Sequence, residues 1–120
     1  MTEMKPEVGH QLPIEMYREG YEYYVETHFH PNSHSCFLQR NLMDLMVYDP
    51  VQFMYLLDQP LLMMVGDHAD TNYMSEQAFE LAITTKEKEF YYLKDATHIQ
   101  TYYKESVVKE AIEKLDIFYK

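Results

Sequence analysis

The sequence predicts a mixed α/β fold, with a short parallel sheet and flanking helices. An unbroken apolar run, Leu61–Val65, follows Pro60 and stops at Gly66, which is typical of a strand buried on both faces. A second strand is expected at Glu89–Leu93. Apolar residues recur at helical spacing between and after these strands, so residues 59–120 are expected to form a βαβα unit. Two strands joined through a helix run parallel.

The two helices of this unit have candidate starts and apolar faces. Ser75 and Ser106 are the expected N-caps, because a serine hydroxyl accepts a hydrogen bond from a free N–H group of the first turn. The expected apolar face of the first helix consists of Ala78, Phe79, Ala82 and Ile83. That of the second consists of Val107, Val108, Ala111, Ile112, Leu115 and Tyr119.

Residues 1–58 read as helices and loops. Pro13 opens a helix in which apolar and tyrosine side chains recur from Ile14 to Tyr24. An irregular loop follows, and a short helix ends near Asp49-Pro50, because a residue before proline avoids helical geometry. Val51–Leu57 is a second short helix or an extended connector. The two segments, 1–58 and 59–120, are expected to form a single structural domain overall.

The composition argues against two classes of binding partner and bears on the location of the chain. The formal net charge of −10 argues against nucleic acid and against an anionic membrane surface, since both need a basic face. No apolar stretch approaches the roughly 18 residues of a membrane span, and Met1–Gly9 lacks the apolar run of a signal peptide. Cys36 is the only cysteine, which excludes an internal disulfide and favours a reducing, cytoplasmic location.

An acid and a histidine follow the two predicted strands. Asp67 and Asp70 come after the first strand, and His98 comes after the second. Working residues of open α/β sheets lie just past the carboxyl ends of strands. A carboxylate there can fix the tautomer of a neighbouring imidazole. On spacing alone this pattern is also compatible with ordinary exposed loop residues.

Short motifs in a fixed order carry a resemblance to a known family. In the second half they are Gln59–Gly66, Ala69-Asp70-Thr71, Ser75-Glu76, Ala82, Lys88-Glu89 and Ala96–Ile99. In the first half they are Glu22-Tyr23-Tyr24, His30–Ser33 and Tyr48-Asp49. Together, over Tyr17–Tyr119, they resemble the C-terminal portion of bacterial α/β-hydrolases of the dienelactone-hydrolase-like, esterase/peptidase-like group. By this resemblance, residues 1–58 correspond to the cap or pre-acid region.

The resemblance implies a catalytic role for two residues. His98 matches the triad histidine and Asp70 the triad acid, with Asp67 as the alternative acid. The parent family hydrolyses esters, thioesters or amides, and the substrate here stays unknown. The family's nucleophile elbow, G-x-S-x-G, is missing from the chain. Without it covalent catalysis has no first step, so we expect a truncated, hydrolase-like protein that is inactive alone, with Asp70 and His98 vestigial.

Two other functions stay open. The first is a non-enzymatic protein that uses hydrolase-derived surfaces to form a homo-oligomer, most simply a dimer, because a two-stranded parallel sheet leaves open edges. The second and weaker one is a small metal-binding domain that uses His28, His30, His34 and Cys36, whose types suit zinc but whose spacing matches no zinc motif. The sequence otherwise predicts no metal and no cofactor.

Overall fold

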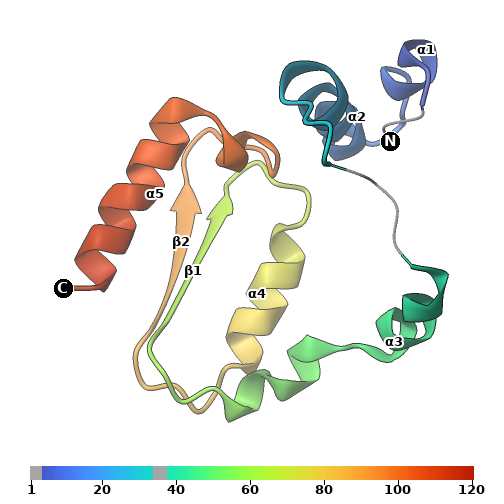
Figure 1. Ribbon diagram of the computed structural model, residues 1–120. Helices are drawn as coiled ribbons and strands as arrows, with labels where there is room; N and C mark the ends of the chain where they lie inside the picture. Colours follow the sequence, from blue (N-terminus) through green and yellow to red (C-terminus); the bar gives the residue numbers. More distant parts are fainter. Residues whose placement is uncertain (1–3, 34–37) are drawn as a thin grey trace. The chain divides into compact units, whose positions relative to one another are not determined.

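The computed structural model describes residues 4–33 and 38–120 (Figure 1). The chain forms two compact units, Met1–Tyr48 and Asp49–Lys120. The sequence predicted that the segment of helices and loops ends at residue 58 and that the βαβα unit begins at residue 59. Whether the chain behaves as one domain stays a prediction. No helix in the described ranges is both long and apolar enough to cross a bilayer.

The first unit consists of short helical segments. They are α1 (Pro6–Gly9), α2 (Glu15–Tyr21), the π-helical η1 (Glu22–Thr27), the 3₁₀ turn η2 (Gln39–Asn41) and α3 (Leu42–Val47). The Arg18 guanidinium donates to the Leu12 carbonyl (2.7 Å) and so ties α2 to the turn before it. Tyr21 is buried against α1, where a Cβ on Gly9 would lie 2.5 Å from the tyrosine ring. The helix expected after Pro13 and the one before Asp49 are both confirmed.

The second unit contains the predicted sheet. Its elements are η3 (Pro50–Leu56, 3₁₀), β1 (Leu61–Gly66), α4 (Asn72–Leu81), β2 (Lys88–Leu93), η4 (Gln100–Tyr102, 3₁₀) and α5 (Glu105–Phe118). The strands pair in parallel from Leu61↔Lys88 to Gly66↔Leu93. The predicted mixed α/β architecture, a short parallel sheet with flanking helices, is therefore confirmed. The segment expected at Val51–Leu57 takes the helical alternative as far as Leu56, and Leu57 is extended.

One face of the sheet packs on α4. Phe90 of β2 meets Phe79 of α4 edge to face, with ring centroids 5.3 Å apart. Tyr92 lies two residues further along β2, and its hydroxyl donates a hydrogen bond to Glu76 of α4 (2.6 Å). Alternate residues of a strand point to the same face, so Phe90 and Tyr92 together fix α4 against the sheet.

The other face packs on α5. The Tyr91 hydroxyl donates to Glu110 of α5 (2.9 Å). Leu93 packs with Ala96 and Val107 in the buried core of this unit, and all three are no more than 3% exposed. Each face of the sheet thus has one helix, which agrees with the separate positions of α4 and α5 beside the strands in Figure 1. Because one helix covers little area, every β1 residue before Gly66 is only half-buried.

The two serine caps and part of each expected apolar helix face are wrong. α4 begins at Asn72 and α5 at Glu105, so Ser75 and Ser106 lie inside helices and cap neither of them. The turn after β1 closes early, since Ala69 N–H donates to Gly66 and Asn72 N–H to Ala69, so helical geometry starts three residues before Ser75. Ile83 and Tyr119 lie beyond the ends of their helices and Ile112 lies within α5, and the side chains of all three are exposed.

Candidate functional site

The loops after β1 and β2 meet at the carboxyl ends of the parallel strands. Backbone hydrogen bonds join them: Asp67 N–H donates to Leu93 O, and His68 N–H donates to Ala96 O, both at 3.0 Å. Gly66 is buried at the crossing, where an added Cβ would lie 2.2 Å from Ala96 O. The approach of two backbones therefore requires glycine at this position.

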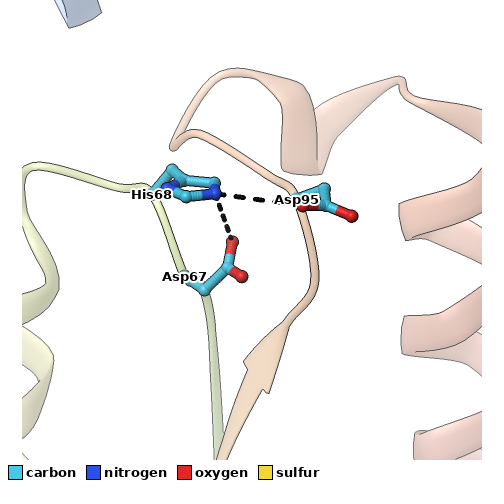
Figure 2. Close-up of side chains that lie close together, drawn as sticks. All are labelled: Asp67, His68 and Asp95. Carbon is cyan, nitrogen blue, oxygen red and sulfur yellow. Dashed lines mark ion pairs between the residues drawn. The ribbon is translucent and has the colours of Figure 1, made fainter.

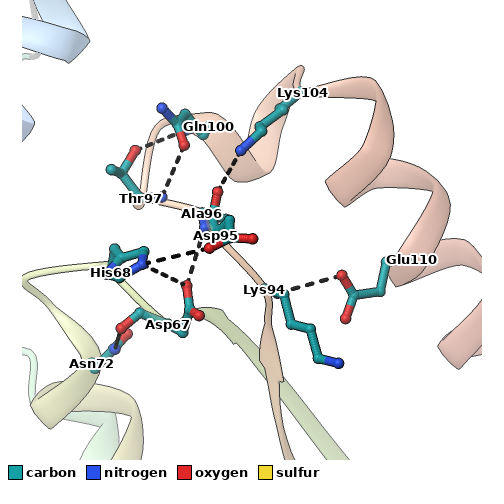
Figure 3. Close-up of polar contacts among 10 residues, drawn as sticks. All are labelled: Asp67, His68, Asn72, Lys94, Asp95, Ala96, Thr97, Gln100, Lys104 and Glu110. Atoms are coloured by element: carbon teal, nitrogen blue, oxygen red, sulfur yellow. Dashed lines mark hydrogen bonds and ion pairs between the residues drawn. The ribbon is translucent and has the colours of Figure 1, made fainter.

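Asp67 links the two loops through its side chain. Its Oδ1 accepts a hydrogen bond from Ala96 N–H (3.1 Å), as Figure 3 shows. This hydrogen bond is the main cause of a lowered pKa of the Asp67 carboxyl, opposed in part by desolvation. The carboxylate thus braces the loop that carries His98, and no hydrogen bond or ion pair joins it to the His98 ring in the described ranges.

His98 is half-buried and both of its ring nitrogens have partners. Nδ1 lies 3.3 Å from Thr71 Oγ1, and Nε2 lies 2.6 Å from the Tyr102 hydroxyl. Tyr102 is on the 3₁₀ turn η4, one helical turn after His98, and the two rings are also in edge contact. Sequence reasoning did not connect Tyr102 with His98. His98 and Tyr102 are four residues apart just before the predicted last helix, and this spacing was the signal that could have revealed their contact.

Asp70 lies next to Thr71, but it is exposed. Its carboxylate makes no hydrogen bond or ion pair with His98 in the part of the chain described. The structure therefore brings Thr71, rather than an acid, to Nδ1 of the imidazole. The assignment of Asp70 as the triad acid, with Asp67 as its alternative, stays a prediction from the family resemblance.

A cavity of about 460 Å³ adjoins His98. Met64, Val65, Ala69 and Met74 supply apolar walls, and Thr71, Asn72, Ser75, His98, Thr101 and Tyr102 supply polar groups. Small-molecule sites combine such walls with a few convergent polar groups. Ser75 lines this cavity from the interior of α4. No hydrogen bond joins it to His98 in the described ranges, so it lacks the base that would activate a nucleophile.

A second polar cluster lies at the same strand ends. His68 Nε2 is 3.8 Å from Asp67 Oδ1 and 3.9 Å from Asp95 Oδ1, as Figure 2 shows. Asp95 has φ 50°, a left-handed conformation that aspartate tolerates better than most residues. None of these three residues lines the His98 cavity.

Half of the proposed His/Cys metal loop is described. His28 is exposed, stacks on Tyr23 (4.4 Å between centroids) and has its Nδ1 2.8 Å from Thr27 Oγ1. His30 Nδ1 accepts a hydrogen bond from Asn32 N–H (3.2 Å). His34 and Cys36 lie outside the described residues. The metal-binding alternative at this loop stays a prediction.

No protein-family model matches the chain, and no curated protein matches it either. The family resemblance therefore rests on the residues themselves.

Proposed function

We propose that this chain is an α/β-hydrolase-like protein that holds the histidine side of a catalytic site and does not turn over substrate alone. The observation that carries the proposal is the position of His98. It follows the second of two parallel strands and lines a cavity at their carboxyl ends, together with the loop after β1. That is the place at which α/β enzymes gather their working residues. A cytoplasmic location belongs to the same proposal.

The geometry supports a base without a nucleophile. His98 Nε2 is the nitrogen that would face a reacting hydroxyl in the parent family, and here it faces Tyr102. The serines in residues 4–33 and 38–120 make no hydrogen bond to the imidazole, and the printed sequence has no nucleophile elbow. A histidine without a paired nucleophile can act only as a weak general base on water. The cavity beside His98 therefore serves ligand binding rather than turnover.

Labelling with a fluorophosphonate probe tests the missing nucleophile. We expect no covalent adduct on the purified chain by intact-mass spectrometry, under conditions in which a control serine hydrolase is fully labelled. A stoichiometric adduct on any of Ser33, Ser35, Ser75 or Ser106 would contradict the proposal. Ser75→Ala is the matched control, because Ser75 is the serine that shares the cavity with His98.

The hydrolase origin is tested separately, by the protonation and hydrogen bonding of the His98 imidazole. Nitrogen NMR of the imidazole should change in Asp70→Asn if Asp70 is the acid that orients His98, and it should stay unchanged in Asp67→Asn. The opposite result would make Asp67 the acid. If neither variant moves the His98 signals while Thr71→Ala does, Thr71 rather than an acid orients Nδ1 of the ring, and the triad assignment is wrong.

A second candidate function is a homo-oligomer, most simply a two-fold dimer. β1 and β2 pair only with each other in the described ranges, so each strand keeps an unpaired edge. β1 is apolar from Leu61 to Val65 yet only half-buried. A second copy would supply the missing cover. Sedimentation equilibrium at micromolar concentration should then give twice the 14.5 kDa chain mass. A folded species at the monomer mass would exclude this candidate.

A further inference from the structure

Two carboxylates and an imidazole converge on one point between the loops that follow β1 and β2. Asp67 and His68 come from the first loop and Asp95 from the second. In Figure 2 the imidazole of His68 lies beside both carboxylates, and its Nε2 forms the shared corner of the group. One ligand atom from each residue lies within 4.8 Å of the other two.

These distances are close to those around a bound metal ion. With metal–ligand bonds of about 2.0–2.2 Å, neighbouring ligand atoms of a tetrahedral site lie roughly 3.4 Å apart. The observed separations from His68 Nε2 are 3.8 Å and 3.9 Å, so each must shorten by about half an ångström for a tetrahedral ion. For an octahedral ion, whose neighbouring ligands lie roughly 3.0 Å apart, each must shorten by a little less than one ångström. The side chains of His68 and Asp95 are 66% and 90% exposed, so rotation about their own bonds suffices.

The charges around the point are also suitable. No lysine or arginine in the described ranges forms an ion pair with the carboxylate of Asp67 or Asp95, and the Lys104 ammonium donates instead to the backbone carbonyl of Asp95. The Ala96 N–H that binds Asp67 favours its ionised form and uses one of about four lone-pair positions on the carboxylate. The chain's net charge of −10 adds a general attraction for cations.

We propose that Asp67, His68 and Asp95 bind a divalent first-row transition-metal ion, such as Mn²⁺ or Zn²⁺, with water in the remaining positions. One imidazole nitrogen and two carboxylate oxygens suit these ions, whereas Mg²⁺ and Ca²⁺ prefer oxygen ligands alone. No spacing argument pointed to this site, because Asp95 joins the other two residues only through the parallel pairing of the strands.

A bound ion would link the two loops that carry Asp70 and His98. The existing links are the Asp67–Ala96 hydrogen bond, the two backbone hydrogen bonds and the contact between Thr71 Oγ1 and His98 Nδ1. The metal adds a bond from Asp95 across to His68. The site does not depend on the hydrolase-like proposal, since none of its three residues lines the cavity.

Electron paramagnetic resonance of Mn²⁺ tests the proposal on the full chain. Free Mn²⁺ gives a strong signal that protein binding broadens, so a titration yields stoichiometry and affinity. We expect one ion per chain and a loss of affinity of at least about tenfold in His68→Ala and in Asp95→Asn. Asparagine is chosen at position 95 because it tolerates the left-handed backbone there, so the variant keeps the loop.

His10→Ala is the matched control. His10 also lies between two carboxylates, but it uses opposite ring nitrogens: Nε2 is 2.9 Å from Glu26 and Nδ1 is 3.7 Å from Glu22. Opposite nitrogens cannot share one ion, so this variant should bind Mn²⁺ like the parent chain. Absence of binding, or equal binding by His68→Ala and Asp95→Asn, would overturn the proposal. Loss of binding in Cys36→Ser instead would also overturn it and move the metal to the cysteine loop.

Discussion

The close crossing at Gly66 makes Gly66→Ala the sharpest test of the site's architecture. A methyl group there would lie 2.2 Å from Ala96 O, 2.8 Å from Ala96 C and 3.0 Å from Thr97 O. All three atoms belong to the backbone of the loop that carries His98, so no side chain can rotate out of the way. The loop must move by more than an ångström to restore an ordinary contact.

The expected cost follows from the bonds that this movement strains. Ala96 O accepts the hydrogen bond of His68 N–H, and the neighbouring Asp67 N–H donates to Leu93 O. Losing two backbone hydrogen bonds costs about 2 kcal/mol, and overpacking adds about 1–3 kcal/mol. We therefore expect Gly66→Ala to lower the free energy of unfolding by about 3–5 kcal/mol. That is a substantial part of the roughly 5–15 kcal/mol by which native domains are stable.

Urea denaturation followed by far-UV circular dichroism measures this loss, with Val65→Ala as the control. Val65 is half-buried one residue earlier on β1, so its truncation weakens the strand without touching the crossing and should cost about 1 kcal/mol. The two variants separate a steric clash from general strand damage. If Gly66→Ala is no less stable than Val65→Ala, the two loops do not approach as described, and the placement of His98 relative to β1 is wrong.

Three further predictions concern the rest of the second unit. Val107→Ala should lower the free energy of unfolding by about 2 kcal/mol, since Val107 is 1% exposed. Val108→Ala on the same helix should cost less than half as much, and urea titrations of both variants measure the difference. The pKa of Tyr91 is raised, mainly by its hydrogen bond to Glu110, so its stabilisation is complete below the unfolded pKa of about 10 and is lost as pH rises through the higher folded pKa. The stability difference between the parent chain and Tyr91→Phe should therefore shrink above pH 10, and a constant difference would contradict this cause. Asp95→Ala should be about 1 kcal/mol less stable than Asp95→Gly, because glycine adopts φ 50° without strain, and equal thermal midpoints would refute the left-handed assignment.

The sequence alone determined the order and type of most elements in the second unit. The apolar run Leu61–Val65 and the run Glu89–Leu93 are strands in the structure, and the helical periodicity after each of them produced α4 and α5. These signals are local: burial on both faces needs consecutive apolar residues, and a helix that packs on a sheet needs an apolar stripe. The sequence did not determine the helix boundaries. Ser75 and Ser106 were the expected N-caps, but the tight turn after β1 lets α4 begin before Ser75, and α5 begins at Glu105.

Only the tertiary structure decided which polar groups meet. The sequence placed His98 and two candidate acids after neighbouring strands, but the parallel register determined that Asp67 reaches Ala96 N–H, that Thr71 reaches the ring of His98, and that Asp95 joins His68. The physical reason is range. Strand and helix formation depend on side chains a few positions apart, whereas a hydrogen bond between two loops depends on register and backbone approach to within a few tenths of an ångström.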